Sequence, residues 1–320
     1  MSTSSEMKTL YLHLGYYKAA STFLQKKVFP KYSDSLNFLS LPNFEILEDE
    51  VWVRSSMRRF AGRSPLVWRR FGHEFFESAF ASAGVDSRKK SLLISDENSL
   101  FRLRKRIAGP DTTVRHIEEL ERQALKYFSS IKILLVIRRQ DTWLASAYAQ
   151  ICSSPKQQWS ENPSQQHFAE WTDSQTSKRK RYYSGFGSNI EYLYLIKNII
   201  KNNIDLTVLP FELLKENKKK FLSEIASFLD QDYVEIGSEK RENVKSTSAN
   251  TWRISKRRKI TLRPSRLFNK IGLSKIDLPN QNISIKLTKK ISNNIMKSYK
   301  KTNKEVSYLI GKDLIKYGYF

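Results

Sequence analysis

The sequence of 320 residues contains a single cysteine, Cys152, and only four histidines, which lie far apart along the chain. One cysteine excludes an internal disulfide framework and any cysteine-rich metal cluster. HExxH and CxxC motifs are missing as well, so no metal site is expected. With 11 glycines and 9 prolines, the chain is also neither collagen-like nor of low complexity.

Long hydrophobic runs are missing too. No stretch reaches the roughly 18 apolar residues of a membrane-spanning helix, and residues 1–6 lack the basic and then apolar pattern of a signal peptide. We therefore expect a soluble protein of the reducing cytoplasm. Hydrophobic residues make up 40% of the sequence and aromatic residues 12%, which is enough for a large core.

Acidic residues are in short supply, because 32 Asp and Glu stand against 56 Lys and Arg, for a net charge of +24. A chain this basic is expected to bind an anionic partner: nucleic acid, an acidic membrane face, a phosphorylated cofactor or an acidic glycan. Residues 251–320 alone carry 18 basic and 3 acidic residues, a net charge of +15. We predict that they form a basic, mainly helical cap or subdomain after an α/β domain of residues 1–250.

Short apolar runs alternate with amphipathic helical patterns. The predicted strands are residues 9–14, 92–95, 131–137 and 206–210, and the predicted helices are residues 19–29, 110–128, 142–151, 189–202 and 213–229. This alternation predicts an α/β fold with a P-loop-like central parallel sheet flanked by helices. Ligands of such sheets bind at the carboxyl ends of the strands, so the residues after each strand are the first place to look for chemistry.

The loop after the first predicted strand has the features of a phosphate site. It consists of Gly15, Tyr16, Tyr17, Lys18, Ala19, Ala20, Ser21 and Thr22. Backbone N–H groups at the start of a helix, together with a lysine and two hydroxyls, suit a phosphate group. The spacing is not that of a Walker A motif, and no Ser or Thr follows the lysine to bind Mg²⁺. A strand end without a ligand is the alternative.

A second group of residues follows the strand 131–137. Arg138 comes directly after this strand, and Ser146 lies on the next predicted helix, on the side away from its apolar residues. Arginine binds phosphate through two parallel N–H groups. A solvated arginine and a serine that packs between helices are the alternative. Two phosphate-seeking groups at neighbouring strand ends suit a ligand with two separated phosphates.

Together these segments resemble the sulfotransferases that use 3′-phosphoadenosine 5′-phosphosulfate (PAPS), in particular a bacterial, carbohydrate-sulfotransferase-like branch. The loop of that family reads H-x-G-x-x-K-[TS]-[GA]-[TS]-[TS]-x-L-Q, and residues 13–25 fit it except at Ala19. Arg138 and Ser146 have the spacing of the family's 3′-phosphate element. Residues 92–98, LLISDEN, are similar to a strand that ends in S-x-E-N in bacterial members.

The resemblance implies roles for the main residues. Lys18 would contact the bridging oxygen of the phosphosulfate and stabilise charge as the sulfuryl group leaves, while Arg138 and Ser146 would hold the 3′-phosphate. Ala19 offers no side-chain hydrogen bond, so we expect the loop to rely on its backbone amides and on the hydroxyls of Ser21 and Thr22.

The hydroxyl that would receive the sulfuryl group needs a general base to take its proton. Glu97, just after the second predicted strand, is the first candidate, and an ion pair with a nearby arginine is the alternative. His13 is a weaker candidate, because a histidine inside a strand is more often structural. We expect His73, His116 and His167 to be structural or exposed to solvent.

Two basic segments are weaker candidates. The resemblance implies that Arg241 and Lys245 contact the 3′-phosphate, and a plain surface loop is the alternative. Arg102 and Arg104 are candidates for binding an acidic acceptor, and a solvated run of charge is equally compatible with the sequence.

The prediction is therefore a PAPS-dependent sulfotransferase that transfers a sulfuryl group in line to a hydroxyl of a carbohydrate or glycolipid. A nucleotide kinase of P-loop type is one alternative. A protein that binds nucleic acid or a membrane surface through its basic C-terminal region is another, although no helix-turn-helix, RNP or zinc pattern occurs and no nucleic acid is expected. Peripheral contact with the inner membrane face is compatible with the leading prediction.

Overall fold

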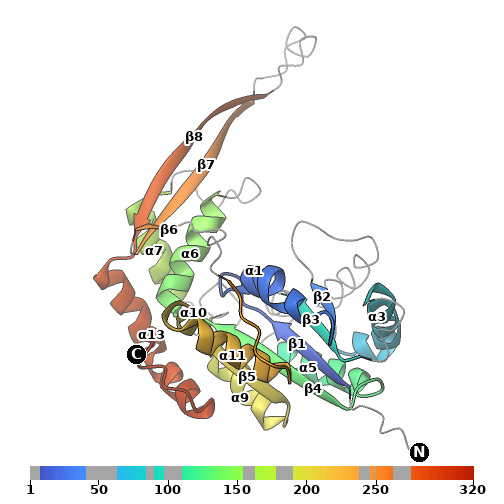
Figure 1. The fold of residues 1–320 in the computed structure, drawn as a ribbon. Helices are drawn as coiled ribbons and strands as arrows, with labels where there is room; N and C mark the ends of the chain where they lie inside the picture. Colours follow the sequence, from blue (N-terminus) through green and yellow to red (C-terminus); the bar gives the residue numbers. More distant parts are fainter. Residues whose placement is uncertain are drawn as a thin grey trace, which may run out of the picture. The chain divides into compact units, whose positions relative to one another are not determined.

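The computed structural model describes residues 8–40, 63–83, 90–96, 110–153, 163–177, 190–237, 246–248, 250–261 and 275–320. The chain forms two compact units, which are described separately below (Figure 1). Unit 1 contains residues 1–139, 178–240 and 299–320, and unit 2 contains residues 140–177 and 241–298. Each unit thus combines distant segments of the sequence, whereas the sequence analysis placed one boundary at residue 250.

Unit 1 is built on a parallel sheet of five strands in the order β2-β3-β1-β4-β5. The strands are β1 (Thr9–Leu14), β2 (Asn37–Ser40), β3 (Leu92–Asp96), β4 (Ser130–Ile137) and β5 (Asp205–Pro210). The predicted central parallel sheet is confirmed. β1 lies in the middle, so the loop that follows it opens between the ends of β3 and β4.

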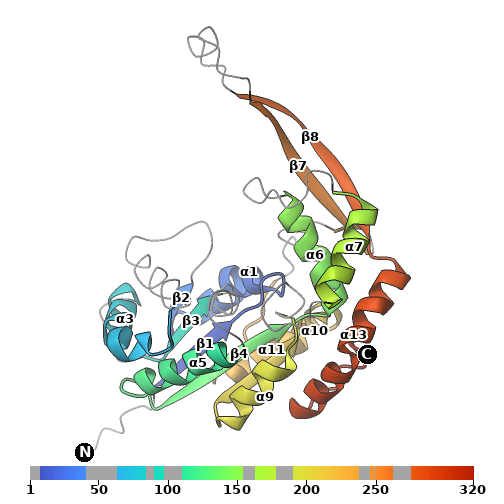
Figure 2. The ribbon, with the colours of Figure 1, turned by 180° about the vertical axis from the view of Figure 1, so that it is seen from behind.

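Helices cover both faces of this sheet. They are α1 (Ser21–Phe23), the π-helical turn η1 (Leu24–Val28), the 3₁₀ turn η2 (Phe29–Tyr32), α3 (Val67–Ala83), α5 (Pro110–Ala124), α9 (Leu193–Lys201), α10 (Phe211–Glu216) and α11 (Lys218–Phe228). On one face α5 packs against α3 and α9 (Figure 2). On the other, Tyr11 of β1 meets Phe228 of α11 edge to face at 5.5 Å, and His13 meets Phe29 at 5.4 Å.

Two predicted helices differ from the observed ones. The segment 19–29 contains one α-helical turn followed by π and 3₁₀ turns, so the loop before it lacks the long helix dipole that was expected. The segment 213–229 is broken at Asn217, whose side chain accepts a hydrogen bond from the Lys220 N–H at 2.9 Å and starts α11. This capping bond satisfies an N–H that a helix start leaves without a partner.

Unit 2 contains two helices, three strands and the beginning of a long helix. These are α6 (Gln140–Ser153), α7 (Gln165–Ser177), β6 (Ser246–Ser248), β7 (Thr251–Thr261), β8 (Lys275–Lys286) and α13 (Lys289–Leu309), of which residues 289–298 belong to this unit. β7 pairs antiparallel with β6 and β8. Gln165 of α7 exchanges two hydrogen bonds with the backbone of Lys286, at 2.7 and 2.8 Å.

The basic C-terminal region is therefore not mainly helical, because two long strands precede α13 (Figure 1). The start of β7 follows the alternation typical of a half-buried strand: Trp252 and Ile254 are buried, and Arg253 between them is exposed. Many lysines and arginines follow these residues, and the net charge of the region therefore gave no indication of a strand. None of the described helices is long and apolar enough to cross a membrane.

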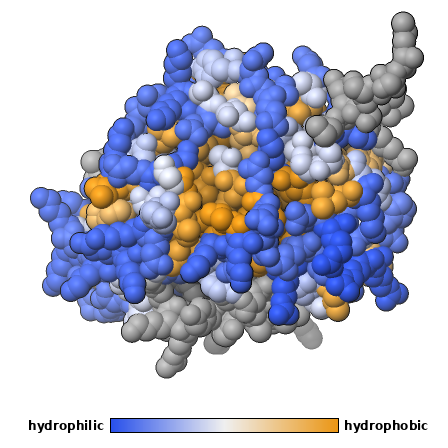
Figure 3. Space-filling view, turned by 90° about the horizontal axis from the view of Figure 1, so that it is seen from below, coloured by the Kyte–Doolittle hydropathy of each residue, from blue (hydrophilic) through white to orange (hydrophobic). Residues whose placement is uncertain are grey.

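The hydrophilic character of the sequence is not spread evenly over the surface. On the face of the molecule drawn in Figure 3, hydrophobic side chains gather in the middle and hydrophilic ones surround them. Large apolar side chains that are exposed in the described part of unit 1 include Leu66, Leu125, Ile200, Tyr308 and Ile315.

The contact between α3 and α5 contains a structural histidine. His116 is buried, and its Nδ1 accepts a hydrogen bond from Trp68 Nε1 at 3.0 Å. Its Nε2 lies 3.2 Å from the carbonyl oxygen of Arg63, which only accepts, so Nε2 carries the hydrogen. Both ring nitrogens are thus satisfied, and the prediction of a structural role is confirmed. Of the other two, His73 is exposed beside the Tyr127 hydroxyl, and half-buried His167 bonds the Tyr148 hydroxyl at 2.7 Å.

We predict that His116 makes unit 1 less stable in mild acid. Burial lowers the pKa of His116 to about 4, so between pH 6.5 and 4 the unfolded chain binds a proton that the folded chain does not. The free energy of unfolding should therefore fall as the pH falls, by up to about 1.4 kcal/mol per pH unit from this group. Urea unfolding at pH 6 and pH 5 should show a smaller pH dependence in His116→Gln than in the wild type. An equal pH dependence in both proteins would contradict this prediction.

Candidate functional site

The phosphate-like loop and the arginine after β4 lie side by side in unit 1. β1 and β4 pair from Thr9 opposite Ser130 to His13 opposite Leu134, so β4 continues beyond the end of β1. Its extension brings Arg138 next to the loop, where Arg138 Nη1 donates a hydrogen bond to the carbonyl oxygen of Lys18 at 2.8 Å. The loop and Arg138, which were singled out separately in the sequence, therefore lie next to each other at one edge of the sheet.

The loop backbone has a conformation that ordinary residues avoid. Lys18 and Ala20 have φ angles of 68° and 67°, in the left-handed region, which costs roughly 1–2 kcal/mol for each non-glycine residue. Ala20 directly precedes the helical residue Ser21. A left-handed residue beside a right-handed one turns successive N–H groups to the same side and makes a concave site for anions. Strain of this kind is concentrated at functional sites.

Gly15 permits the loop to fold closely over the end of β1. A Cβ atom at this position would lie 2.6 Å from Ser21 Oγ and 3.0 Å from His13 Cε1. Ser21 is buried, and its hydroxyl donates a long hydrogen bond of 3.4 Å to the carbonyl oxygen of Tyr16. The first glycine of the motif is therefore required by close approach.

Arg138 is held on three sides. Its guanidinium lies over the ring of Phe211 at 4.8 Å, directly beyond the point where Ile137 pairs with Pro210. The Tyr192 hydroxyl donates to the Arg138 carbonyl oxygen at 2.6 Å and accepts from the Arg138 N–H at 3.3 Å. Only 8% of Arg138 is exposed. The arginine is thus fixed in place before any ligand arrives.

Glu212 connects the backbone next to Arg138 to the last residues of the chain. Its Oε1 accepts a hydrogen bond from the Arg139 N–H at 3.2 Å, and its Oε2 accepts one from the Tyr319 hydroxyl at 2.9 Å. Burial raises the pKa of Glu212, and the Tyr319 hydrogen bond and the Arg138 charge oppose that rise. Gly318, with a φ of 73°, approaches the Arg139 side chain so closely that a Cβ atom would lie 3.0 Å from Nη1.

The sequence did not point to Tyr192 or Tyr319 as parts of this site, and it gave Glu212 no role of its own. Glu212 stands just after a predicted strand, so its place at the carboxyl edge was foreseeable. Its partner Tyr319 lies more than a hundred residues further along the chain, and nothing in the sequence pairs the two.

Asp96 is a further carboxylate at this edge. It is the last residue of β3, it is buried, and it pairs with Leu14 at the end of β1. It directly precedes Glu97, the predicted general base.

The remaining predicted residues have different outcomes. Ser146 is half-buried on α6 of unit 2, and its role in holding a phosphate stays a prediction. Five predicted residues lie outside the described part of the chain: Glu97, Arg102, Arg104, Arg241 and Lys245.

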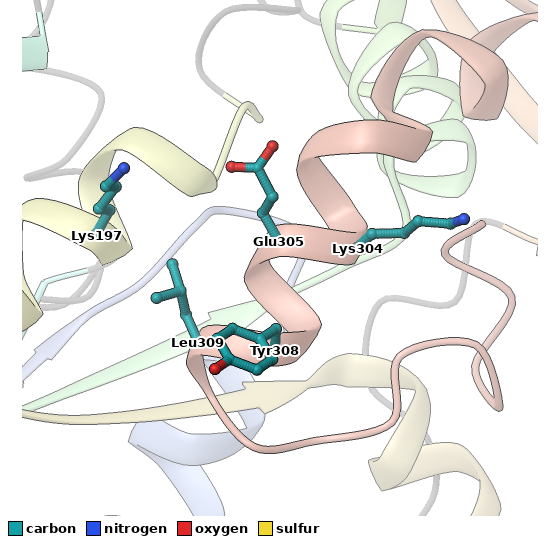
Figure 4. Close-up of a pocket in the computed structure, with 5 residues that line it drawn as sticks. All are labelled: Lys197, Lys304, Glu305, Tyr308 and Leu309. Carbon is teal, nitrogen blue, oxygen red and sulfur yellow. The ribbon is translucent and has the colours of Figure 1, made fainter.

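A hollow elsewhere in unit 1 is separate from this site. It lies between α9 and α13 and is lined by Lys197, Lys304, Glu305, Tyr308 and Leu309, none of which belongs to the loop or its partners (Figure 4). Figure 4 shows Glu305 and Leu309 on the side of α13 that faces α9, while Lys304 points away.

We predict that Gly15→Ala destabilises unit 1 by about 1–3 kcal/mol, the usual effect of forcing an extra methyl group into a packed site. The new Cβ would clash with Ser21 Oγ, and the buried ring of His13 prevents a shift the other way. Chemical denaturation measures the loss. The double variant Gly15→Ala/Ser21→Ala lacks the closest clashing atom and should recover part of the stability. Equal stability of Gly15→Ala and the wild type would contradict the prediction.

We also predict that Tyr319→Phe destabilises the protein by about 1–3 kcal/mol, because it removes the hydroxyl that donates to Oε2 of the buried Glu212. Tyr308→Phe is the matched control, since Tyr308 lies on α13 and is 88% exposed. Urea denaturation of both variants measures the difference. A Tyr319→Phe variant as stable as its control would show that Tyr319 does not stabilise Glu212 and, through it, the backbone next to Arg138.

Comparison with solved structures places this architecture among known folds. A sulfotransferase from Alicyclobacillus acidocaldarius superposes with a TM-score of 0.52 at 12% identity, over 97% of this chain and 98% of that one. The sulfotransferase domain of the Synechococcus PCC 7002 olefin synthase matches at 10% identity, over 73% of this chain and 78% of that one, with a TM-score of 0.34.

The sulfotransferase domain of the curacin biosynthetic pathway matches at 9% identity, over 72% of this chain and 76% of that one, with a TM-score of 0.33. No protein-family model matches the sequence, and no curated protein does so. The fold assignment rests on the Alicyclobacillus structure, which is covered almost from end to end: the chain has the fold of a sulfotransferase.

Proposed function

We propose that this protein is a PAPS-dependent sulfotransferase that transfers a sulfuryl group to a hydroxyl of a carbohydrate or glycolipid. The observation that carries the proposal is the hydrogen bond from Arg138 to the Lys18 carbonyl, because it holds the loop and the arginine after β4 together at one edge of the sheet. The sulfotransferase fold supports the same assignment.

The donor set fits an adenosine nucleotide with two separated phosphates. Lys18 and Arg138 supply two cations, and the left-handed residues Lys18 and Ala20 shape the loop for an anion. We assign the loop to the 5′-phosphosulfate and Arg138 to the 3′-phosphate, with Ser146, Arg241 and Lys245 as further proposed contacts to the nucleotide.

When bound, PAPS supplies a sulfuryl group that is activated by its phosphate leaving group. Sulfuryl transfer is in line, as phosphoryl transfer is, so the protein mainly positions the reactants and neutralises charge. In this proposal Lys18 offsets the negative charge that develops on the leaving phosphate. Arg138 fixes the other end of the nucleotide, and its rigid surroundings limit the entropy lost on binding.

The acceptor side of the proposal rests on residues outside the described part of the chain. Glu97 is the proposed base that takes the proton of the acceptor hydroxyl, since it directly follows Asp96 at the end of β3. Arg102 and Arg104 are proposed to attract an acidic acceptor.

Ligand binding separates this proposal from its alternatives. A ligand that binds only the folded protein raises the free energy of unfolding by about 2.7 kcal/mol when present at a hundred times its Kd. We expect a rise in melting temperature with 3′,5′-adenosine bisphosphate, and none with ATP and Mg²⁺ or with a DNA duplex. A rise with ATP and Mg²⁺ alone would favour a nucleotide kinase, and a rise with DNA alone would favour a nucleic-acid-binding protein.

We predict that Lys18→Ala lowers sulfuryl transfer at least about a hundredfold, which corresponds to the loss of one strong contact to the transition state. Transfer of radiolabelled sulfate from PAPS to a panel of glycan acceptors measures the rate. Lys26→Ala is the matched control, because Lys26 is exposed on η1 close to the same loop. Unchanged turnover in Lys18→Ala would remove Lys18 from the mechanism.

For the nucleotide, we predict that Arg138→Lys weakens binding of 3′,5′-adenosine bisphosphate by about tenfold, because lysine keeps the charge and loses the two-pronged geometry of the guanidinium. Titration calorimetry measures the affinity. An unchanged affinity would mean that Arg138 has a purely structural role.

A further inference from the structure

His13 lies beneath the phosphate loop, and one of its ring nitrogens is not accounted for. It is fully buried in the central strand β1, and its Nε2 has no hydrogen-bond partner among the described residues. His116 in the same unit is equally buried, and both of its nitrogens are satisfied. Buried polar groups without a partner are rare and call for an explanation.

The other nitrogen of His13 belongs to a hydrogen-bonded chain. Ser95 lies opposite His13 in the pairing of β1 with β3, and its Oγ is 2.7 Å from His13 Nδ1. Gln25 Nε2 lies 3.0 Å from Ser95 Oγ and 3.3 Å from the Ser95 carbonyl oxygen. Because a carbonyl oxygen only accepts, the amide nitrogen of Gln25 faces Ser95 and donates to it.

This chain fixes the tautomer of His13. The buried Ser95 hydroxyl has one hydrogen to donate, and His13 Nδ1 is the acceptor that the described residues offer it. Nδ1 therefore accepts, and the hydrogen of the neutral ring lies on Nε2. Burial lowers the pKa of His13 to about 3, so the ring stays neutral at physiological pH. The result is a buried N–H donor beneath the loop.

The His13 Nε2 atom and the Ser21 hydroxyl lie close to the same point, the position that a Cβ atom on Gly15 would take. A Cβ atom added to Gly15 would lie 2.6 Å from Ser21 Oγ and 3.1 Å from His13 Nε2. The present contact of the Ser21 hydroxyl with the Tyr16 carbonyl, at 3.4 Å, is longer than the usual hydrogen bond of a hydroxyl, about 2.5–3.0 Å. The Tyr16 carbonyl therefore holds the Ser21 hydroxyl only weakly.

We propose that Gln25, Ser95 and His13 are positioning residues that aim the Ser21 hydroxyl at an anion in the loop. In the bound state His13 Nε2–H donates to Ser21 Oγ, and the Ser21 hydroxyl donates to an oxygen of the anion. Each donor then points the same way, from Gln25 to the ligand, and such chains strengthen one another cooperatively. The inference rests on the proposed function only in naming the anion as the 5′-phosphate of an adenosine nucleotide.

The same chain accounts for three positions in the sequence motifs to which the family resemblance assigned no role. They are the histidine two residues before Gly15, the glutamine four residues after Ser21, and the serine near the end of β3. Parallel pairing of β1 with β3, and the first helical turns after the loop, bring the three together under it.

Nuclear magnetic resonance tests the proposal directly. In protein labelled with ¹⁵N-histidine, the ring nitrogens of His13 should show the neutral Nε2–H tautomer. Addition of 3′,5′-adenosine bisphosphate should shift the Nε2–H proton downfield, because it gains an acceptor, while the ring signals of His116 stay in place. In Ser21→Ala the ligand-induced shift of His13 should disappear.

Binding measurements supply a second test. We expect Ser95→Ala and Ser21→Ala each to weaken bisphosphate binding about three- to tenfold, and the double variant to be no weaker than the worse single one, because the two act through one chain. His116→Gln is the control with a buried histidine in a structural role, and its affinity should equal that of the wild type. If the losses of binding free energy in the two single variants simply added up in the double variant, the proposal would be overturned.

The outcomes separate this inference from the proposed function. Failure of the bisphosphate to bind the wild type overturns the proposed function, and titration of the same His13 signal with inorganic phosphate then decides the inference alone. An Nδ1–H tautomer, or an Nε2–H resonance that does not move when either anion binds, overturns the inference whatever the fate of the proposed function.

Discussion

The hydrogen bond from the Arg138 guanidinium to the Lys18 carbonyl depends on several features of the fold at once. β4 must continue past the end of β1, which the parallel register provides. The loop must turn the Lys18 carbonyl toward β4, and Lys18 has a left-handed backbone there. Its 2.8 Å length shows that both conditions hold together. A loop of another shape would leave a buried arginine without this acceptor, and an unpaired buried charge is strongly destabilising.

The surroundings of Arg138 compensate the burial of its charge. The Phe211 ring provides a cation–π contact, the Tyr192 hydroxyl bonds both the N–H and the carbonyl of Arg138, and the carboxyl group of Glu212 accepts a hydrogen bond from the next residue, Arg139. Glu212 is in turn fixed by Tyr319 from the end of the chain. A site assembled this firmly before binding suits a reaction in which catalysis consists of positioning and charge stabilisation, because little reorganisation remains for the reacting state.

The sequence predicted the part of this arrangement that follows from hydrophobic pattern and parallel pairing. β1 and β4 are mainly apolar runs, so their ends, and with them Lys18 and Arg138, were expected at one edge. The turns after Ser21 were not foreseen, because π and 3₁₀ geometry has no distinct residue pattern in this segment. β7 was not predicted, since its buried apolar residues, Trp252 and Ile254, are followed by a run of basic ones. Contacts such as that of Glu212 with Tyr319 require the folded chain.

His13 and His116 show why burial alone does not identify a functional histidine. Both are buried, and in both burial lowers the pKa. They differ in whether each ring nitrogen has a partner: His116 lies between a donor from Trp68 and an acceptor from Arg63, while His13 has Ser95 on one side only. Leaving an N–H group buried without an acceptor costs about 1–3 kcal/mol. Such a cost beneath a strained loop is understandable if ligand binding makes Ser21 Oγ available as the acceptor, because an anion that takes the Ser21 hydrogen then allows the missing hydrogen bond from His13 to form.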